Sequence, residues 1–326
     1  MLGISKGVLT VAVAICVAGS AFAQDQSGFG RPPKITTLAA PPDRDIGLIA
    51  PSFIFNNASV ATGAVGLRNR GDGGINISGV GAPIKQAFAY WAVVTNGPPT
   101  AAAANISLKK GAAGGSFTNI QGVPIGAGAS PCWKGDRTTV YRGIVPNSLA
   151  NGNGLYLVVL RAGANGAVGG QSPWEVRNLP LFEGVSIVLV GSGASKVAVY
   201  DEDLAGEMFY GRLAYQLKSP FSVAAATTVL LNEIGADGQS GVGVSEVASV
   251  SAEVTRLNGR VIAGPGSPGG AGDWNGIVAG PLPQLWDNNT HNVTNAAKAG
   301  NPLVLSFVIN APDDCLVTVA NVLSVE

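Results

Sequence analysis

The sequence predicts an all-β fold, an antiparallel β-sandwich of the jelly-roll-like kind. Three observations predict this class. Short apolar runs are separated by Gly, Pro, Asn and Asp, several of these runs alternate apolar with polar residues, and helical patterns are scarce. The 46 glycines and 20 prolines among 326 residues supply the turns that many short strands require.

The expected strands extend along the chain up to its end. In order they cover 53–55, 87–94, 105–108, 155–160, 185–190, 196–200, 210–217, 227–231, 252–257, 303–309 and 315–325. Alternation is clear over 210–217, where Leu213, Tyr215 and Leu217 share one face. A period of two residues is typical of a strand with one buried face.

Two segments depart from this half-buried pattern. The run 185–190 is apolar except for Ser186, which is typical of a central strand covered on both faces. The nearest approach to a helix is 293–299, which Gly300 and Pro302 cut short. Helices are therefore expected to contribute almost nothing to the core.

The first 23 residues have the pattern of a secretory signal peptide. Lys6 supplies the charged region, an apolar run extends from Val8 to about Ala18, and Ala21-Phe22-Ala23 forms a small-x-small cleavage site. The apolar run is shorter than the roughly 20 residues that a membrane span needs. We expect a secreted protein, extracellular or at the cell surface, with the periplasm as the alternative compartment and no membrane span in the mature form.

The remainder is expected to hold one domain. Residues 24–45 are polar and rich in proline, which is typical of a flexible lead-in. Residues 46–326 contain no low-complexity linker, so they are expected to form a single large β-sandwich domain.

Cleavage would remove Cys16 and leave Cys132 and Cys315. An even number of cysteines in an oxidising compartment predicts a disulfide between them. The alternative is a pair of buried free thiols. Zinc binding is not expected, because the chain has no CxxC motif and only one histidine.

The charge balance excludes some partners. Lys plus Arg and Asp plus Glu both number 20, so the formal net charge is zero, and only 12% of residues are charged. A nucleic-acid-binding domain would carry a basic surface, so no nucleic acid is expected as a partner.

Catalysis is not expected, although the sequence leaves the question open. His291 is the single histidine, it lies in a polar, turn-like stretch, and no Gly-x-Ser-x-Gly motif is present. A secreted glycoside hydrolase with a carboxylate pair is an alternative. Its candidate acids, among which the spacing selects no pair, are Glu175, Glu183, Asp201, Glu202, Asp203, Glu207 and Glu233.

A calcium-assisted carbohydrate-binding module is a further alternative. Calcium binds six to eight oxygen ligands, and two turn-like stretches offer Asp273, Asn275, Asp287 and Asn289. No cofactor is expected apart from the calcium of this alternative, and turn capping explains the same residues equally well. The tryptophans with loop-like contexts, which could stack against sugar rings if exposed, are Trp133, Trp174, Trp274 and Trp286.

The leading hypothesis is a secreted, non-catalytic structural surface module that is adhesive or self-assembling. A surface with few charges has little mutual repulsion to keep copies apart. The composition is similar to that of secreted shell, sheath or surface-assembly proteins of bacteria. The expected partner is an extracellular protein or polysaccharide surface, or other copies of the same chain.

Overall fold

The structure is a computed structural model. It describes residues 43–326 apart from 112–114, 132–135, 172–177, 238–252, 266, 268–273 and 277–284. The described residues belong to one compact unit, Arg31–Glu326. The predicted signal peptide 1–23 and nearly all of the predicted lead-in 24–45 lie outside the described residues, so both stay predictions.

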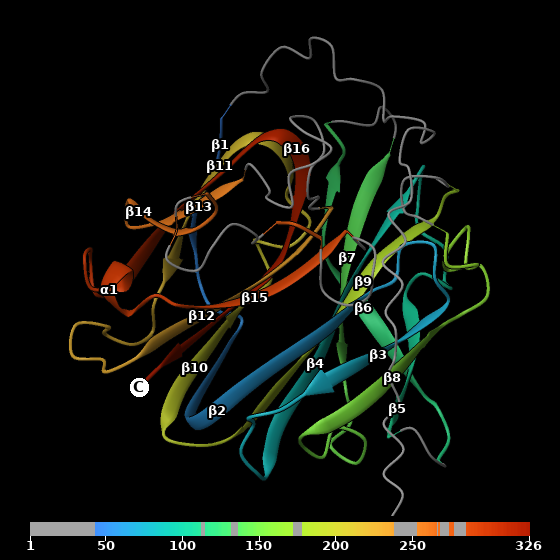
Figure 1. Cartoon of the computed structure of the whole chain (residues 1–326), viewed down its shortest axis with the longest axis horizontal. Helices are drawn as coiled ribbons and strands as arrows, with labels where there is room; N and C mark the ends of the chain where they lie inside the picture. The colour runs from blue at the N-terminus through green and yellow to red at the C-terminus, as the bar shows by residue number, and fades with distance from the viewer. Residues whose placement is uncertain are drawn as a thin grey trace, which may run out of the picture. The chain divides into compact units, whose positions relative to one another are not determined.

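Strands dominate the described chain (Figure 1). In order they are β1 (Arg44–Ile49), β2 (Phe53–Gly66), β3 (Asp72–Ile77), β4 (Ile84–Thr95), β5 (Asn105–Lys110), β6 (Thr118–Ala129), β7 (Arg137–Ile144), β8 (Gly154–Leu160), β9 (Leu181–Ser192), β10 (Ser195–Tyr200), β11 (Met208–Lys218), β12 (Val229–Ala236), β13 (Val254–Leu257), β14 (Arg260–Ala263), β15 (Trp286–Asn292) and β16 (Val304–Val325). Within these described residues the only helix is α1 (Thr294–Ala297), one turn inside the segment 293–299 that comes nearest to a helical pattern in the sequence. The all-β prediction is confirmed.

The last strand unites two runs that the sequence presents as separate strands, 303–309 and 315–325. β16 pairs with β11 on both sides of a register shift between Tyr210 and Gly211. The register skips residues 312–314, as in a β-bulge, and pairing continues on either side of them. Backbone pairing therefore carries the strand through a Pro-Asp-Asp sequence that by itself favours a turn.

The strands form one continuous hydrogen-bonded sheet. Its order is β1-β11-β16-β10-β2-β9-β4-β7-β6-β5-β8-β3, and β12, β13, β14 and β15 branch from it. Every strand pairing recorded for the described residues is antiparallel except β1 with β11, which is parallel. Many neighbours in the sheet are far apart in the sequence, so long connections define the topology.

The sheet folds back on itself, and apolar side chains fill the space between its faces. Strands β2, β4 and β9 enclose one core together with β3, β5 and β8. A Cβ atom added at Gly63 of β2 would lie 2.9 Å from side-chain atoms of Ile75 and Ile77 in β3, so these two strands pack face to face. This layering confirms the predicted sandwich.

Strand β9 lies at the centre, as predicted for 185–190. Val185, Ile187 and Leu189 enter the core shared with β3 and β8. Val188 and Val190 enter a second core, shared with β10 and β16, on the opposite face. Alternate residues of an apolar strand thus contribute to two different cores. A third core fills the C-terminal half between β11, β12 and β16, with contributions from β1 and α1.

Candidate functional sites

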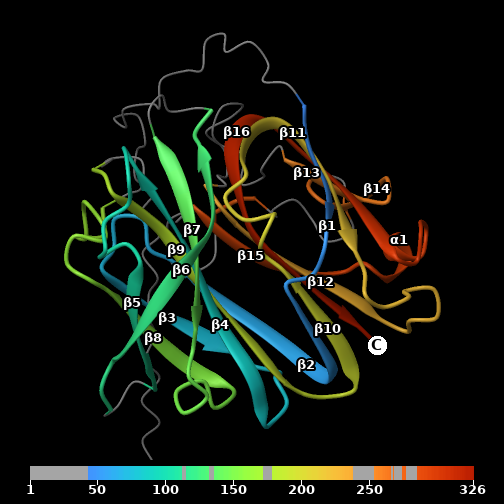
Figure 2. The same ribbon diagram turned by 180° about the vertical axis from the view of Figure 1, so that it is seen from behind.

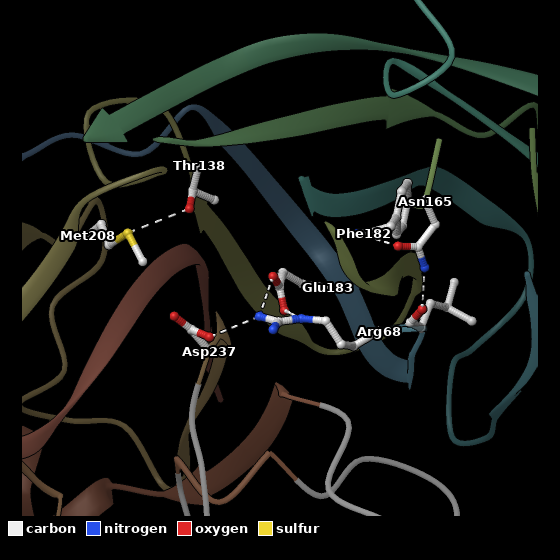
Figure 3. A network of polar contacts seen from close by, with 8 residues as sticks. Arg68, Thr138, Asn165, Phe182, Glu183, Met208 and Asp237 are labelled. Atoms are coloured by element: carbon white, nitrogen blue, oxygen red, sulfur yellow. Dashed lines mark hydrogen bonds and ion pairs between the residues drawn. The ribbon is translucent and has the colours of Figure 1, made fainter. Parts of the chain in front are cut away.

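A buried ion-pair triad joins distant parts of the chain (Figure 3). Arg68 follows β2, Glu183 lies in β9, and Asp237 follows β12. The Arg68 Nε and Nη2 atoms donate to the two oxygens of Glu183 at 2.9 and 2.7 Å, and Nη2 lies 3.0 Å from Oδ1 of Asp237. None of the three side chains is more than 3% exposed. The triad therefore fastens the end of β12 to β2 and β9.

The two carboxylates keep Arg68 charged. Burial alone lowers the pKa of Arg68, but the charges and hydrogen bonds of Glu183 and Asp237 outweigh it and raise the pKa above its usual value. The planar guanidinium matches the Glu183 carboxylate with two parallel hydrogen bonds. Because the triad has almost no surface open to solvent, we interpret it as a structural element.

Asn165 holds the turn that carries Arg68. Its amide nitrogen donates to the carbonyls of Leu67 and Arg70 at 3.0 and 3.1 Å. Its amide oxygen accepts from the Phe182 backbone at 3.2 Å (Figure 3). A single buried side chain thus satisfies backbone groups of the turn after β2 and of β9. These bonds position Arg68 next to Glu183.

A second polar network lies where β4 and β7 meet the end of β10. One Asp201 oxygen accepts from the Tyr90 hydroxyl at 2.7 Å and from Arg142 at 2.9 Å. Arg142 also donates to Glu202 at 3.0 Å, and its guanidinium lies 4.7 Å from the ring centre of Phe53. Burial and then the Asp201 charge raise the pKa of Tyr90 well above its usual value. The polar side chains of this network thus lie among apolar side chains.

A surface of two exposed and two half-buried apolar side chains adjoins this second network. We define the Phe53 patch as Phe53, Phe55, Val123, Arg142 and Ile144. Val123 and Ile144 are 54% and 52% exposed on the neighbouring strands β6 and β7.

The residues of the Phe53 patch share one face of the sheet. Ile144 pairs with Phe88 of β4, and Val123 pairs with Arg142. Phe53 stacks obliquely on Phe88 with ring centres 4.6 Å apart. Exposed apolar side chains that lie together on one face are typical of an interaction site.

The predicted calcium ligands fall in different settings. Asp287 and Asn289 lie on strand β15 and not in the turn that the sequence indicates, Asn275 lies near them in the chain, and Asp273 is outside the described residues. Asp287 accepts a hydrogen bond from the Gly276 backbone at 2.9 Å. In the described parts of the chain, no group of three or more His, Cys, Asp or Glu residues could hold a metal ion. The four-residue calcium prediction stays untested.

The sugar-stacking hypothesis is wrong for two of its four tryptophans. Trp274 and Trp286 are 3% and 0% exposed. Their indole nitrogens donate to Thr255 at 3.1 Å and to Ser186 at 2.9 Å. The large apolar area of an indole ring favours burial when its N–H finds a partner, and both rings are therefore closed to a ligand. Trp133 and Trp174 lie outside the described residues, where the hypothesis stays untested.

Only one of the two cysteines of the predicted disulfide lies within the described residues. Cys315 lies on β16, is buried, and is not a free thiol. Cys132 lies outside the described residues. Its pairing with Cys315 therefore stays a prediction.

Among the residues considered for catalysis, the four acids Glu183, Asp201, Glu202 and Glu207 are held in ion pairs. His291 lies on β15 opposite Leu231 and not in a turn, because backbone pairing with β12 extends through this polar sequence. Glu183 and Asp201 are buried in the two networks above, and Glu207 pairs with Arg44 at 2.5 Å. Glu175 lies outside the described residues. Nothing in these contacts favours the hydrolase alternative.

Comparisons with known proteins add no family. No protein-family model matches the chain, and no curated protein matches it. Among solved structures, the ANX2 ectodomain from Arabidopsis thaliana has 7% identity and a TM-score of 0.25, and the match covers 84% of this chain and 82% of that one. A chain from the complex of the plant peptide RALF23 with FER and LLG2 has 8% identity and a TM-score of 0.22, and the match covers 86% and 94% of the two chains. Similarity this weak supports no functional argument. In the described part of this chain, no helix is long and apolar enough to cross a membrane.

Sequence reasoning missed both the Arg68 triad and the Phe53 patch. A signal for the triad exists, because Arg68 follows the apolar stretch Val65-Gly66-Leu67 and Glu183 interrupts an otherwise apolar strand. An ionisable residue inside such a run predicts a buried partner. The patch has no such signal, because its residues come from three separate strands.

Proposed function

We propose that this chain is an exported, non-catalytic structural module that acts at a surface through contact, by adhesion or by self-assembly. The observation that carries the proposal is the Phe53 patch, where apolar side chains more than half exposed lie beside a guanidinium already paired with two carboxylates. Such a surface can be covered by a partner without leaving an unpaired charge behind.

Two further observations support the proposal. The chain carries no net charge, so copies of it repel one another weakly. Among the described residues, the Arg68 triad is buried and internally paired, and the buried Asp201 is paired with Arg142, which suits a rigid scaffold more than a reaction centre. An exported compartment and a disulfide between Cys132 and Cys315 belong to the same proposal.

The test is a charge insertion into the patch. Replacing Val123 and Ile144 by lysine should raise the concentration needed for half-assembly, or for half-saturation of a polysaccharide or protein-coated surface, at least about tenfold. Burying each aliphatic side chain contributes about 1.5–3 kcal/mol, and about 1.4 kcal/mol corresponds to tenfold. Sedimentation velocity over a concentration series and negative-stain microscopy measure assembly, and glycan and protein arrays measure adhesion.

The matched control is the double lysine variant at Val168 and Leu303. These side chains are similarly exposed, at 59% and 50%, but lie outside the patch. It should behave as the unmodified protein. A chain that stays monomeric at every concentration and binds nothing on the arrays would refute the proposal.

A further inference from the structure

We propose that β1 is an exchangeable strand, and that in the assembled protein β1 of one copy pairs with β11 of the next. The inference rests on the proposed function and deepens it, because it names the partner as a second copy and the contact as a strand. Four features of β1 and its neighbours carry it.

The first feature is the position of β1 in the sheet. Consecutive strands β1 and β2 lie at opposite ends of the series β1-β11-β16-β10-β2. Only residues 50–52 connect them. Figure 2 shows β1 beside β11, where it forms the outer strand of this part of the sheet. Detaching β1 would therefore leave the other strand pairings of the sheet intact.

The second feature is the weak attachment of β1. Of its six residues only Ile49 is fully buried, while Ile46 packs partly against the C-terminal core and Leu48 is 56% exposed. The pairing is parallel and has a register shift between Asp45 and Leu48. Gly47 stands inside this shift with φ +78°, a conformation that favours glycine. A short, irregular edge strand detaches more readily than a long central one.

The third feature is the specific fit of β1 to β11. Arg44 lies 2.5 Å from Glu207 and donates to the Met208 carbonyl at 3.1 Å, and Arg212 lies 3.5 Å from Asp43. Basic and acidic groups thus alternate across the interface. These ion pairs are exposed, so they select register and direction more than they add stability. The segment 43–49 satisfies both pairs and places Ile49 in the C-terminal core, which favours the same segment of a second copy as the occupant.

The fourth feature is the connection between β1 and β2. It is three residues long and contains Pro51, which restricts its backbone. Short, constrained hinges favour exchange of a terminal element between copies, because an extended connection relieves the constraint. Each copy would donate β1 to one neighbour and accept β1 from another. Such a head-to-tail contact extends into a chain unless its rotation closes a ring.

Cysteine pairs test the exchange. Leu48 and Gln216 are register partners, and both are exposed. Adjacent strands lie about 4.8 Å apart, which is within the range of a disulfide. A mixture of the full-length Leu48→Cys and Gln216→Cys variants should yield disulfide-linked heterodimers on a non-reducing gel, at least about tenfold more than Leu48→Cys mixed with the equally exposed Val168→Cys.

The double variant Leu48→Cys/Gln216→Cys, oxidised while dilute, locks β1 onto its own chain. It should lose assembly and recover it after mild reduction, under which the unmodified protein assembles unchanged. A locked variant that assembles like the unmodified protein would overturn strand exchange and leave the proposed function intact. Equal heterodimer yields in the two mixtures would overturn it as well. An unmodified protein that never assembles would refute strand exchange, and the proposed function would then rest on adhesion alone.

Discussion

At the scale of single residues, the protein places ionisable groups inside its sheet and matches each of the described clusters internally. The Arg68 triad and the Asp201 network both pair a buried carboxylate with a guanidinium at less than 3.1 Å. A buried charge is costly unless it is paired, so removing one partner is more damaging than the pair is stabilising. Stability should therefore respond asymmetrically to changes at these sites.

Arg68→Met should lower the free energy of unfolding by about 3–5 kcal/mol, because it leaves Glu183 and Asp237 buried without their cation. Urea unfolding followed by tryptophan fluorescence measures the loss. Arg70→Met, two residues along, is the control and should change stability by no more than about 0.5 kcal/mol. Similar stabilities for the two variants would contradict the role assigned to the triad.

Buried tyrosines predict a loss of stability in alkali. Burial and Asp201 raise the pKa of Tyr90 well above 10.0, and burial raises that of Tyr200. A pKa that is higher in the folded than in the unfolded state adds stability that is complete below the unfolded value, about 10, and is lost as the pH rises toward the folded value. Each such tyrosine should steepen the decline of the free energy of unfolding with pH by up to about 1.4 kcal/mol per pH unit.

Urea unfolding between pH 8 and 11.5, with tyrosinate absorbance recorded in parallel, checks this prediction. In Tyr90→Phe the free energy of unfolding should decline less steeply with pH, because the contribution of Tyr90 is absent. A decline identical in Tyr90→Phe and the unmodified protein would show that Tyr90 ionises normally.

At the scale of elements, close approach between strands decides which glycines can be replaced. A Cβ atom at Gly184 of β9 would lie 2.4 Å from Cγ of Trp286, the buried tryptophan of β15. Gly184→Ala should therefore lower stability by about 1–3 kcal/mol through overpacking. Gly71→Ala is the control, since its added Cβ would meet Val168 at an ordinary 3.5 Å. Thermal unfolding compares them, and equal midpoints would contradict this account of packing.

Periodicity identified some elements and missed others for a physical reason. The alternating run 210–217 and the apolar run 185–190 are strands, since one or both of their faces are buried and the pattern records it. Strands β1, β3, β6, β7, β14 and β15 escaped detection, and β6 and β15 show why. β6 is largely exposed, and β15 reads Trp-Asp-Asn-Asn-Thr-His-Asn, a polar sequence typical of turns. Each is a strand because its backbone pairs with a neighbour, β7 or β12.

At the scale of the whole molecule, strands that are far apart in the sequence pair with one another, as β2 does with β9 and β10 and β1 does with β11. The predicted disulfide would connect the segment after β6 to β16. We expect peptide mapping without reduction to recover a Cys132–Cys315 cross-linked peptide, and reduction to lower the free energy of unfolding by about 4–5 kcal/mol, because the bond closes a loop of more than 100 residues.

The variant with serine at both cysteines is the control, and its stability should be insensitive to reductant. Titration of two free thiols in the unreduced, unfolded mature protein would contradict the predicted bond. The predicted disulfide would also affect assembly. It would hold β16 in place, and β16 pairs with β11, the strand that accepts β1.

The sequence by itself determined the fold class, the central position of the 185–190 strand and the scarcity of helix, because these follow from local periodicity and turn chemistry. Only the tertiary structure decided that Trp274 and Trp286 are core residues, that Arg68 meets Glu183 and Asp237, and that Phe53, Val123 and Ile144 share a surface. Arg68 meets partners 115 and 169 positions away, and the other contacts depend on which side of a strand faces a second layer. The two-residue period of a sequence indicates that one face of a strand is buried. Which side chains pack against that face depends on the order in which distant strands pair.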